Sequence, residues 1–193
     1  MLSFWNFVTD FGDSAVTLPL ALWVLICLTA SGERRAASAW ITAIAGAAVA
    51  IGLLKLIFGV CGPAITAVHV ISPSGHMAMS TAVYGSLALL ITASPSSQNR
   101  RLVMVAAAIV IFAIGWSRVV LHDHSRSEIA LGFIVGGAGM VLFWRMLGQS
   151  RIPALRLKWL VIGCAALVAV LHGTRLVVEP EIKRLAWHLR SIC

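Results

Sequence analysis

One stretch of this chain that holds both acidic and basic residues reads Ser117-Arg118-Val119-Val120-Leu121-His122-Asp123-His124-Ser125-Arg126-Ser127-Glu128. It separates two long apolar runs in a chain of 193 residues, of which only 11% are charged. Polar groups at the edge of a bilayer are costly unless they are solvated or used. Two further polar segments, residues 73–76 and the single Lys55, also border apolar runs. We therefore expect all three segments to lie at membrane boundaries.

The composition is that of an integral membrane protein. Hydrophobic residues make up 60% of the chain and the mean hydropathy is +0.94, whereas soluble domains contain about 45–50% apolar residues. The net charge of +8 comes from Lys and Arg that cluster between apolar runs, which favours contact with anionic lipid over nucleic acid binding. The four cysteines are far apart and predict neither a metal site nor a disulfide framework. Residues 1–193 are interpreted as one membrane domain.

The apolar runs predict an all-α fold, a polytopic bundle of five or six transmembrane helices. The runs cover residues 14–31, 36–54, 77–98, 102–116 and 125–144, with a shorter sixth at 157–171. A transmembrane helix needs about 20 residues, so the sixth run is the weakest candidate. Glycines and prolines in residues 56–72 favour a loop at the membrane surface. The spacing of apolar and charged residues in both terminal segments predicts amphipathic surface helices.

Two further patterns concern packing and orientation. Gly132-x-x-x-Gly136 in the fifth run would allow close approach between helices. The connections after runs one, three and five hold most of the Lys and Arg, and the positive-inside tendency places them in the cytoplasm. The three polar segments then face the outside. The basic C-terminal tail fits this orientation only if the sixth run does not cross the membrane.

The polar segments hold residues suited to phosphate chemistry. Ser74, Gly75 and His76 immediately precede a predicted helix, whose N-terminus would attract an anion; alternatively, Ser74 is an ordinary N-cap. His124 and Glu128 are four residues apart, so the carboxylate could orient the imidazole. Alternatively, Glu128 belongs to a capping box that begins at Ser125.

Two basic side chains could add positive charge to the same site. Arg118 suits bidentate binding of phosphate, and Lys55 could act as a point charge or could snorkel to the interface. The neighbouring His69, His122 and Asp123 match no motif and are expected to be solvated surface residues.

Together the three segments resemble the signature of the type 2 phosphatidic acid phosphatase superfamily, a family of membrane phosphatases related to vanadium haloperoxidases. That signature is Lys-x6-Arg-Pro, then Pro-Ser-Gly-His, then Ser-Arg-x5-His-x3-Asp. Here Lys55 is followed by six residues and Gly62-Pro63, residues 73–76 match in full, and the third motif ends in Glu128 instead of Asp. Gly62 stands where the family has a phosphate-binding arginine. The resemblance covers residues 14–147, and residues 148–193 add a helix and a tail.

The resemblance implies hydrolysis of a lipid phosphate or lipid diphosphate without metal or cofactor. His124 would attack phosphorus and form a phosphohistidine, Glu128 would orient it, and His76 would protonate the leaving oxygen. The residues implied to hold the phosphate oxygens are Lys55, Ser74, Gly75 and Arg118.

Several points are left open by the sequence. Arg126 is the nearest basic residue that could compensate for Gly62, unless it faces lipid headgroups. The expected location is the inner membrane of a bacterium, with the site facing the periplasm. The partners are the bilayer and a lipid substrate, and the oligomeric state is open. The alternatives are a lipid-linked phosphotransferase that uses the same histidine and a non-catalytic phosphate-binding membrane protein.

Overall fold

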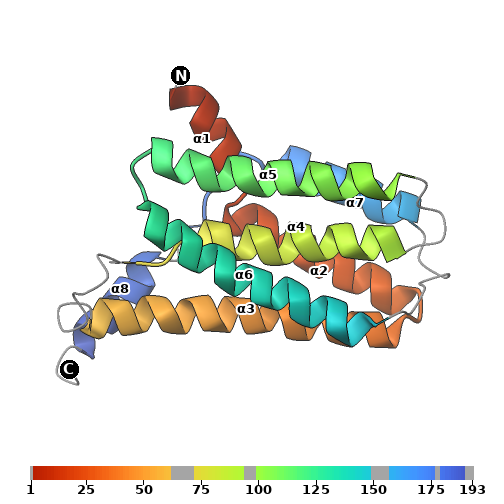
Figure 1. Ribbon diagram of the computed structural model, residues 1–193, viewed down its shortest axis with the longest axis horizontal. Helices are drawn as coiled ribbons and strands as arrows, with labels where there is room; N and C mark the ends of the chain where they lie inside the picture. Colours follow the sequence, from red (N-terminus) through yellow and green to blue (C-terminus); the bar gives the residue numbers. More distant parts are fainter. Residues whose placement is uncertain (1, 62–71, 94–98, 149–156, 177–178, 190–193) are drawn as a thin grey trace.

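A computed structural model shows the fold of the protein (Figure 1). It describes residues 2–61, 72–93, 99–148, 157–176 and 179–189. The helices in these ranges are α1 (Leu2–Asp10), α2 (Ser14–Ala30), α3 (Arg34–Cys61), α4 (Gly75–Ala93), α5 (Arg100–Val120), α6 (Arg126–Leu147), α7 (Leu157–Leu171) and α8 (Glu179–His188). The described ranges contain no β-strand. The predicted all-α fold is therefore confirmed.

Five segments are long and apolar enough to cross a bilayer, which confirms the predicted polytopic membrane bundle. The first segment joins α1 and α2, and the other four are α3, α4, α5 and α6. In Figure 1, α2 to α7 run along the long axis of the molecule, whereas α1 projects from one side. α7 contains 15 residues, fewer than the roughly 20 that a full crossing needs.

α3 is longer than the sequence predicted. Residues 56–61, predicted to be part of a surface loop, continue the helix past Lys55. Lysine is a good helix former, and its side chain lies against the neighbouring Gly75 of α4, so its charge does not end the helix. Gly59 is tolerated because α8 packs closely there: a Cβ on Gly59 would lie 3.0 Å from Ala186. The rest of the predicted loop, residues 62–71, is outside the described ranges.

Glycines on α6 allow that helix to lie directly on α4. A Cβ on Gly132 would lie 2.5 Å from the carbonyl oxygen of Ser74, and one on Gly136 would overlap the carbonyl of Ala78. Side chains larger than glycine are therefore excluded at these two positions. The close approach predicted from Gly132-x-x-x-Gly136 is confirmed.

A buried aromatic pair joins the first part of α3 to the last part of α6. Trp40 of α3 and Phe143 of α6 meet edge to face, with ring centroids 5.7 Å apart, and both are almost fully buried. The indole N–H of Trp40 donates to the carbonyl of Ala21 in α2, at 2.9 Å. This pair joins α2, α3 and α6 and satisfies the one polar group that the tryptophan carries.

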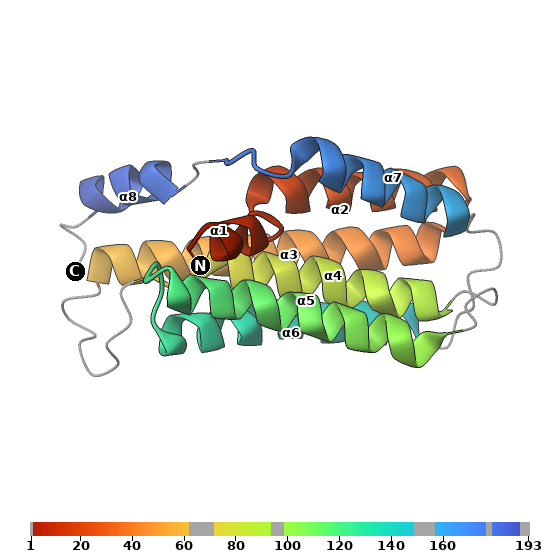
Figure 2. The same ribbon diagram turned by 90° about the horizontal axis from the view of Figure 1, so that it is seen from above.

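The C-terminal segment returns to the N-terminal corner of the molecule. α7 packs along α2 (Figure 2), where the indole N–H of Trp23 donates to the carbonyl of Leu160 at 3.3 Å. The chain then passes α1, with the ring of His172 against Phe7 and Phe11. α8 lies beside the end of α3 and is the helix predicted in the tail.

The sequence predicted no disulfide framework, but one of the cysteines is in a disulfide. Cys61, the last residue of α3, is disulfide-bonded. Cys27 and Cys164 are free thiols. Widely spaced cysteines give no local sign of pairing, because a disulfide depends on which chain segments meet in the fold.

Candidate active site

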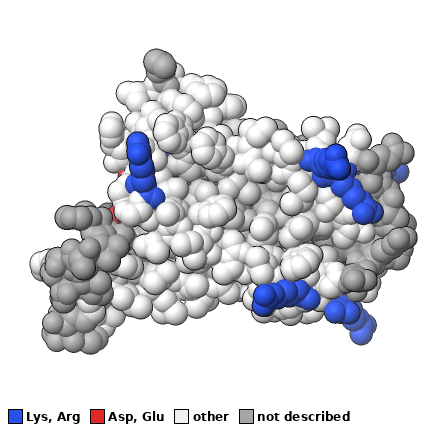
Figure 3. Space-filling model, in the orientation of Figure 1, with Lys and Arg blue, Asp and Glu red and all other residues white. Residues whose placement is uncertain are grey.

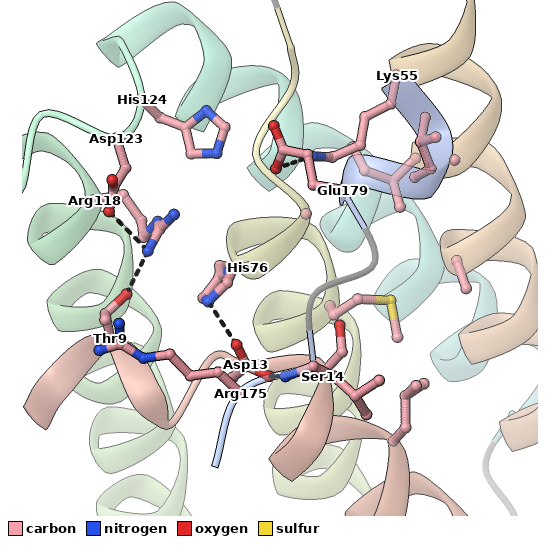
Figure 4. Close-up of a pocket in the computed structure, with 18 of the residues that line it drawn as sticks. Thr9, Asp13, Ser14, Lys55, His76, Arg118, Asp123, His124, Arg175 and Glu179 are labelled. Atoms are coloured by element: carbon pink, nitrogen blue, oxygen red, sulfur yellow. Dashed lines mark hydrogen bonds and ion pairs between the residues drawn. The ribbon is translucent and has the colours of Figure 1, made fainter. Parts of the chain in front are cut away.

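The cavity that contains the predicted site residues has a volume of about 430 Å³ and lies between α2, α3, α4 and α5 (Figure 4). The predicted residues that line it are Lys55, Gly75, His76, Arg118 and His124. The three polar segments of the sequence therefore meet in one place, although they come from different helices.

Glu128 orients His124. The Nδ1 atom of His124 lies 3.0 Å from Oε2 of Glu128, and both side chains are largely buried. A carboxylate can only accept a hydrogen bond, so the proton of a neutral His124 lies on Nδ1 and the lone pair on Nε2. Burial lowers the pKa of His124, and the hydrogen bond to Glu128 offsets part of that effect. The net lowering of this pKa favours the neutral imidazole near pH 7.

The alternative interpretation of Glu128, a capping box, is also correct, because the two roles coexist. Ser125 accepts a hydrogen bond from the Glu128 N–H at 3.3 Å, and the Ser125 N–H donates to Oε2 of Glu128 at 3.0 Å. The same Oε2 contacts His124. The capping box at the start of α6 therefore holds the carboxylate in place for the histidine.

The segment before α4 is attached to the first turn of α6. The Ser72 N–H donates to Oε1 of Glu128 at 2.8 Å, and the Ser74 N–H donates to the Glu128 carbonyl at 3.1 Å. Ser74 is fully buried and its hydroxyl accepts from the Met77 N–H at 3.3 Å. Ser74 is thus the N-cap of α4, and it is not among the residues that line the cavity.

Lys55 and Gly75 lie side by side on the cavity wall. A Cβ on Gly75 would lie 3.4 Å from Cε of Lys55, at van der Waals contact. Nζ of Lys55 forms an ion pair with Oε2 of Glu179 in α8, at 3.2 Å. The side chain of Lys55 is only 10% exposed, so it lies in the cavity instead of snorkelling outward. The N-terminus of α4 and this ammonium group therefore provide positive charge next to each other in the cavity.

Arg118 contacts a hydroxyl and a carboxylate through Nη1, while its buried Nε has no partner among the described residues. Its Nη1 lies 3.0 Å from the hydroxyl of Thr9 and 3.0 Å from Oδ2 of Asp123. Its Nε is buried and has no hydrogen-bond partner in the described part of the chain. Buried donors are nearly always satisfied, so the free Nε–H suits an anionic ligand. Asp123, expected to be a solvated surface residue, is exposed and is also this arginine's ion-pair partner.

A comparison with known proteins identifies the family. The family model described as the PAP2 superfamily matches residues 36–152, more than half of the chain. The chain belongs to the PAP2 superfamily. An uncharacterized 22.5 kDa protein from the cps region of Klebsiella pneumoniae is 31% identical over 174 residues, which cover 86% of this chain and 81% of that protein. No solved structure matches the chain. Membership in the PAP2 superfamily implies phosphatase activity, and the five apolar helices indicate a membrane protein.

Several cavity residues lie outside the part that matches the PAP2 superfamily. They are Thr9, Asp10, Asp13, Ser14 and Leu18 from the N-terminal segment, and Arg175, Leu176, Glu179 and Ile182 from the C-terminal segment. The sequence analysis missed all of them as site residues. Only Asp13 carries a local signal, because an aspartate before an apolar run is a typical N-cap. Asp13 is indeed the N-cap of α2.

Arg126 lies away from the cavity. It is the first residue of α6, is exposed and is not among the residues that line the cavity. Arg175 lines the cavity instead, and its Nε donates to Oδ1 of Asp10 at 3.0 Å. Gly62, where the PAP2 signature has arginine, and His69 lie outside the described ranges.

Proposed function

We propose that this protein is a membrane-embedded phosphatase that hydrolyses a lipid phosphate or a lipid diphosphate through a phosphohistidine intermediate. The observation that carries the proposal is the hydrogen bond between His124 and Glu128 inside a cavity that also holds Lys55 and Arg118. Phosphoryl transfer depends mainly on positioning and on positive charge around the phosphoryl oxygens. This cavity provides both.

The reaction would proceed in two steps. In the first, Nε2 of His124 attacks phosphorus, the bond from phosphorus to the lipid oxygen breaks, and His76 gives a proton to that oxygen. In the second, water attacks phosphorus, the bond to Nε2 breaks, His76 takes the proton from the water, and inorganic phosphate leaves. Lys55, Arg118 and the N-terminus of α4, at Ser74 and Gly75, would stabilise the charge on the phosphoryl oxygens.

A lipid substrate fits the walls of the cavity. Its polar end is formed by the residues described above, and the rest of the wall includes Leu18, Ala48, Ile51 and Met79. Leu18 of α2 is 44% exposed, so the apolar wall continues to the surface that faces lipid in a membrane bundle. A phosphate bound beside Lys55 could therefore stay attached to a chain that remains in the bilayer.

Arg175 is the candidate in this chain for the charge that Gly62 does not provide. Arg175 is among the residues that line the cavity. Its side chain is 54% exposed and its Nε donates to Asp10. Arginine binds phosphate with charge-assisted, often bidentate hydrogen bonds. Because it comes from the segment after α7, the C-terminal extension would complete the phosphate site.

We infer that the cavity opens toward the periplasm. Arg34 and Arg35 begin α3, Arg100 and Arg101 begin α5, and Arg145 ends α6. In Figure 3, most visible Lys and Arg lie at the end where α5 begins and α6 ends, far from the cavity end. The positive-inside tendency supports a cytoplasmic position for that end. The disulfide-bonded Cys61 at the opposite end suits an oxidising compartment. The basic residues of α8 lie at the cavity end (Figure 1) and are therefore an exception to the positive-inside tendency.

Labelling tests this orientation. With the native cysteines replaced by alanine, Ser127→Cys at the cavity end should react with an impermeant thiol reagent in intact cells, and Asn99→Cys should not. Both positions are exposed. The reverse pattern would overturn the periplasmic assignment.

The activity is tested by phosphate release from the purified protein. The panel would contain phosphatidic acid, phosphatidylglycerol phosphate, a polyprenyl diphosphate and lipid A phosphate, each assayed with and without a chelator. We expect release that resists the chelator and is lost in His124→Ala. Transfer of the phosphoryl group to an added lipid or sugar acceptor would instead indicate a transferase. No turnover of any substrate would favour a non-catalytic phosphate-binding protein.

A further inference from the structure

Asp13 lies beside His76 at the junction of α1 and α2. Its Oδ2 is 3.6 Å from Nε2 of His76, and its side chain is 7% exposed (Figure 4). Its other oxygen, Oδ1, accepts hydrogen bonds from the Ala15 N–H at 2.8 Å and the Leu176 N–H at 2.9 Å. The carboxylate is therefore fixed in orientation by backbone groups from two distant parts of the chain, and only Oδ2 faces the histidine.

The turn that carries Asp13 is wedged against α4 and α5. A Cβ on Gly12 would lie 2.6 Å from Ile114, 2.9 Å from the hydroxyl of Ser80 and 3.3 Å from the ring of His76. The hydroxyl of Tyr84 donates to the carbonyl of Phe11 at 2.6 Å. These contacts hold the backbone of the turn on the face of α4 that carries His76, so the position of Asp13 does not depend on its own side chain.

Asp13 is the carboxylate that contacts His76, at 3.6 Å. The same cavity is lined by three fixed positive charges, Lys55, Arg118 and Arg175, and by three further carboxylates, Asp10, Asp123 and Glu179, and His124 lies on its far side. Fixed positive charges disfavour an imidazolium. A general acid must carry its proton before the leaving group departs. Asp13 is the carboxylate placed to stabilise that protonated form.

We propose that Asp13 is the positioning residue for His76, keeping this histidine protonated and oriented as the general acid. The inference rests on the proposed phosphatase function and adds a residue from outside residues 36–152. With Nε2–H directed at Asp13, the Nδ1–H bond breaks and its proton passes to the leaving oxygen. The electron pair stays on Nδ1, and in the second step Nδ1 accepts a proton from the attacking water.

Asp13→Asn is a selective test because the backbone dictates how the amide sits. The Ala15 and Leu176 N–H groups need an acceptor, so the amide oxygen takes the place of Oδ1 and the cap of α2 is retained. The amide NH2 then takes the place of Oδ2 and presents donors to Nε2 of His76. A protonated Nε2 would face a donor there, so the imidazolium is disfavoured.

The experiment compares a poor and a good leaving group. With dodecyl phosphate, we expect Asp13→Asn to lower kcat by at least about tenfold, up to the factor of about 10²–10⁴ that a general acid contributes. The alkaline limb of the pH profile of kcat should move to lower pH. With 4-nitrophenyl phosphate, which needs little protonation of its leaving group, kcat should change by less than about threefold. A purely structural role would lower both activities together and would overturn the inference.

Two controls separate this inference from its alternatives. Asp10→Asn removes the charge of a neighbouring buried carboxylate that pairs with Arg175, and it should affect the two substrates in parallel. Asp13→Ser keeps a capping side chain but removes the carboxylate without introducing an amide. It should lower kcat with dodecyl phosphate as Asp13→Asn does. Wild-type kcat in Asp13→Ser would show that the introduced amide causes the effect, and would overturn the inference.

A second readout does not depend on activity. Spectra of the protein with isotope-labelled histidine, assigned with His76→Gln, should show His76 losing its proton at lower pH in Asp13→Asn than in the wild type. An unchanged His76 titration would overturn the inference. If neither substrate is turned over but His76 shifts as expected, the proposed phosphatase function fails while the pairing of Asp13 with His76 stands.

Discussion

Nζ of Lys55 in α3 lies 3.2 Å from Oε2 of Glu179 in α8, so a carboxylate from the C-terminal segment is the ion-pair partner of the lysine that we propose as a phosphate ligand. In the proposed mechanism, the substrate phosphate would compete with this carboxylate for Lys55. The Glu179 side chain is 40% exposed, which makes it a weak competitor, because partly exposed ion pairs contribute at most about 1 kcal/mol.

The first prediction follows from this contact. Glu179→Gln should lower KM by up to about fivefold and leave kcat within about twofold, because only a competitor for the ground-state phosphate is removed. Glu181→Gln is the matched control, since Glu181 lies on the same helix and pairs with the exposed Arg184. Steady-state kinetics would contradict the prediction if Glu179→Gln raised KM, or if both variants changed KM equally.

A second prediction separates the two candidate arginines. Arg175→Ala should lower kcat/KM by about one to two orders of magnitude, since a charge-assisted contact with phosphate contributes about 1.5–3 kcal/mol. Arg126→Ala should stay within about twofold, because Arg126 is exposed outside the cavity. Gly62→Arg should partly restore the activity of Arg175→Ala. A large loss in Arg126→Ala with none in Arg175→Ala would assign the compensating role to Arg126.

Contacts between residues close in the sequence could be predicted, whereas contacts between residues far apart in the sequence could not. His124 and Glu128 are four residues apart, so helical spacing alone predicted their contact, and the Pro-Ser-Gly-His segment indicated the start of α4. By contrast, Leu176 and Asp13 are separated by 163 positions, and Glu179 and Lys55 by 124. No spacing rule predicts such contacts, because they depend on how α7 packs against α2 and returns the chain to the cavity.

Helix ends were also harder to predict than helix positions. The sequence placed a boundary at Lys55 and another before Arg118 because a charged residue usually marks the edge of an apolar run. In the structure both residues lie inside helices, since their side chains point into a polar cavity between helices. A charge that has such a cavity beside it does not need to end the span.

A third prediction concerns pH. His124 must be neutral to attack phosphorus, and the hydrogen bond to Glu128 raises a pKa that burial otherwise lowers. Glu128→Gln keeps a side chain that can complete the capping box but removes the negative charge, so the pKa of His124 should fall further. The acid limb of kcat/KM should move to lower pH, while the plateau falls by about 10²-fold or more. An acid limb that moved to higher pH would refute the proposed role of Glu128.

A fourth prediction tests the packing that positions the site. Gly136→Ala should destabilise the protein by about 1–3 kcal/mol, because a Cβ there would overlap the carbonyl of Ala78 and the side chain of Thr81. Gly137→Ala is the control, since a Cβ at Gly137 would meet nothing within 4 Å. Thermal unfolding in detergent should show a lower Tm for Gly136→Ala only. Equal effects at both positions would show that the α4–α6 contact is not close.

The covalent intermediate gives the most direct test of the proposed nucleophile. A substrate carrying radiolabelled phosphate would be mixed with the enzyme and quenched in alkali, which preserves phosphohistidine, and the labelled peptide would be sequenced. We predict label on His124, increased in amount when hydrolysis is slowed, and absent from His124→Ala protein that elutes and unfolds like the wild type. Label on a different residue, or normal turnover by His124→Ala, would contradict the assignment of His124 as the residue that attacks phosphorus.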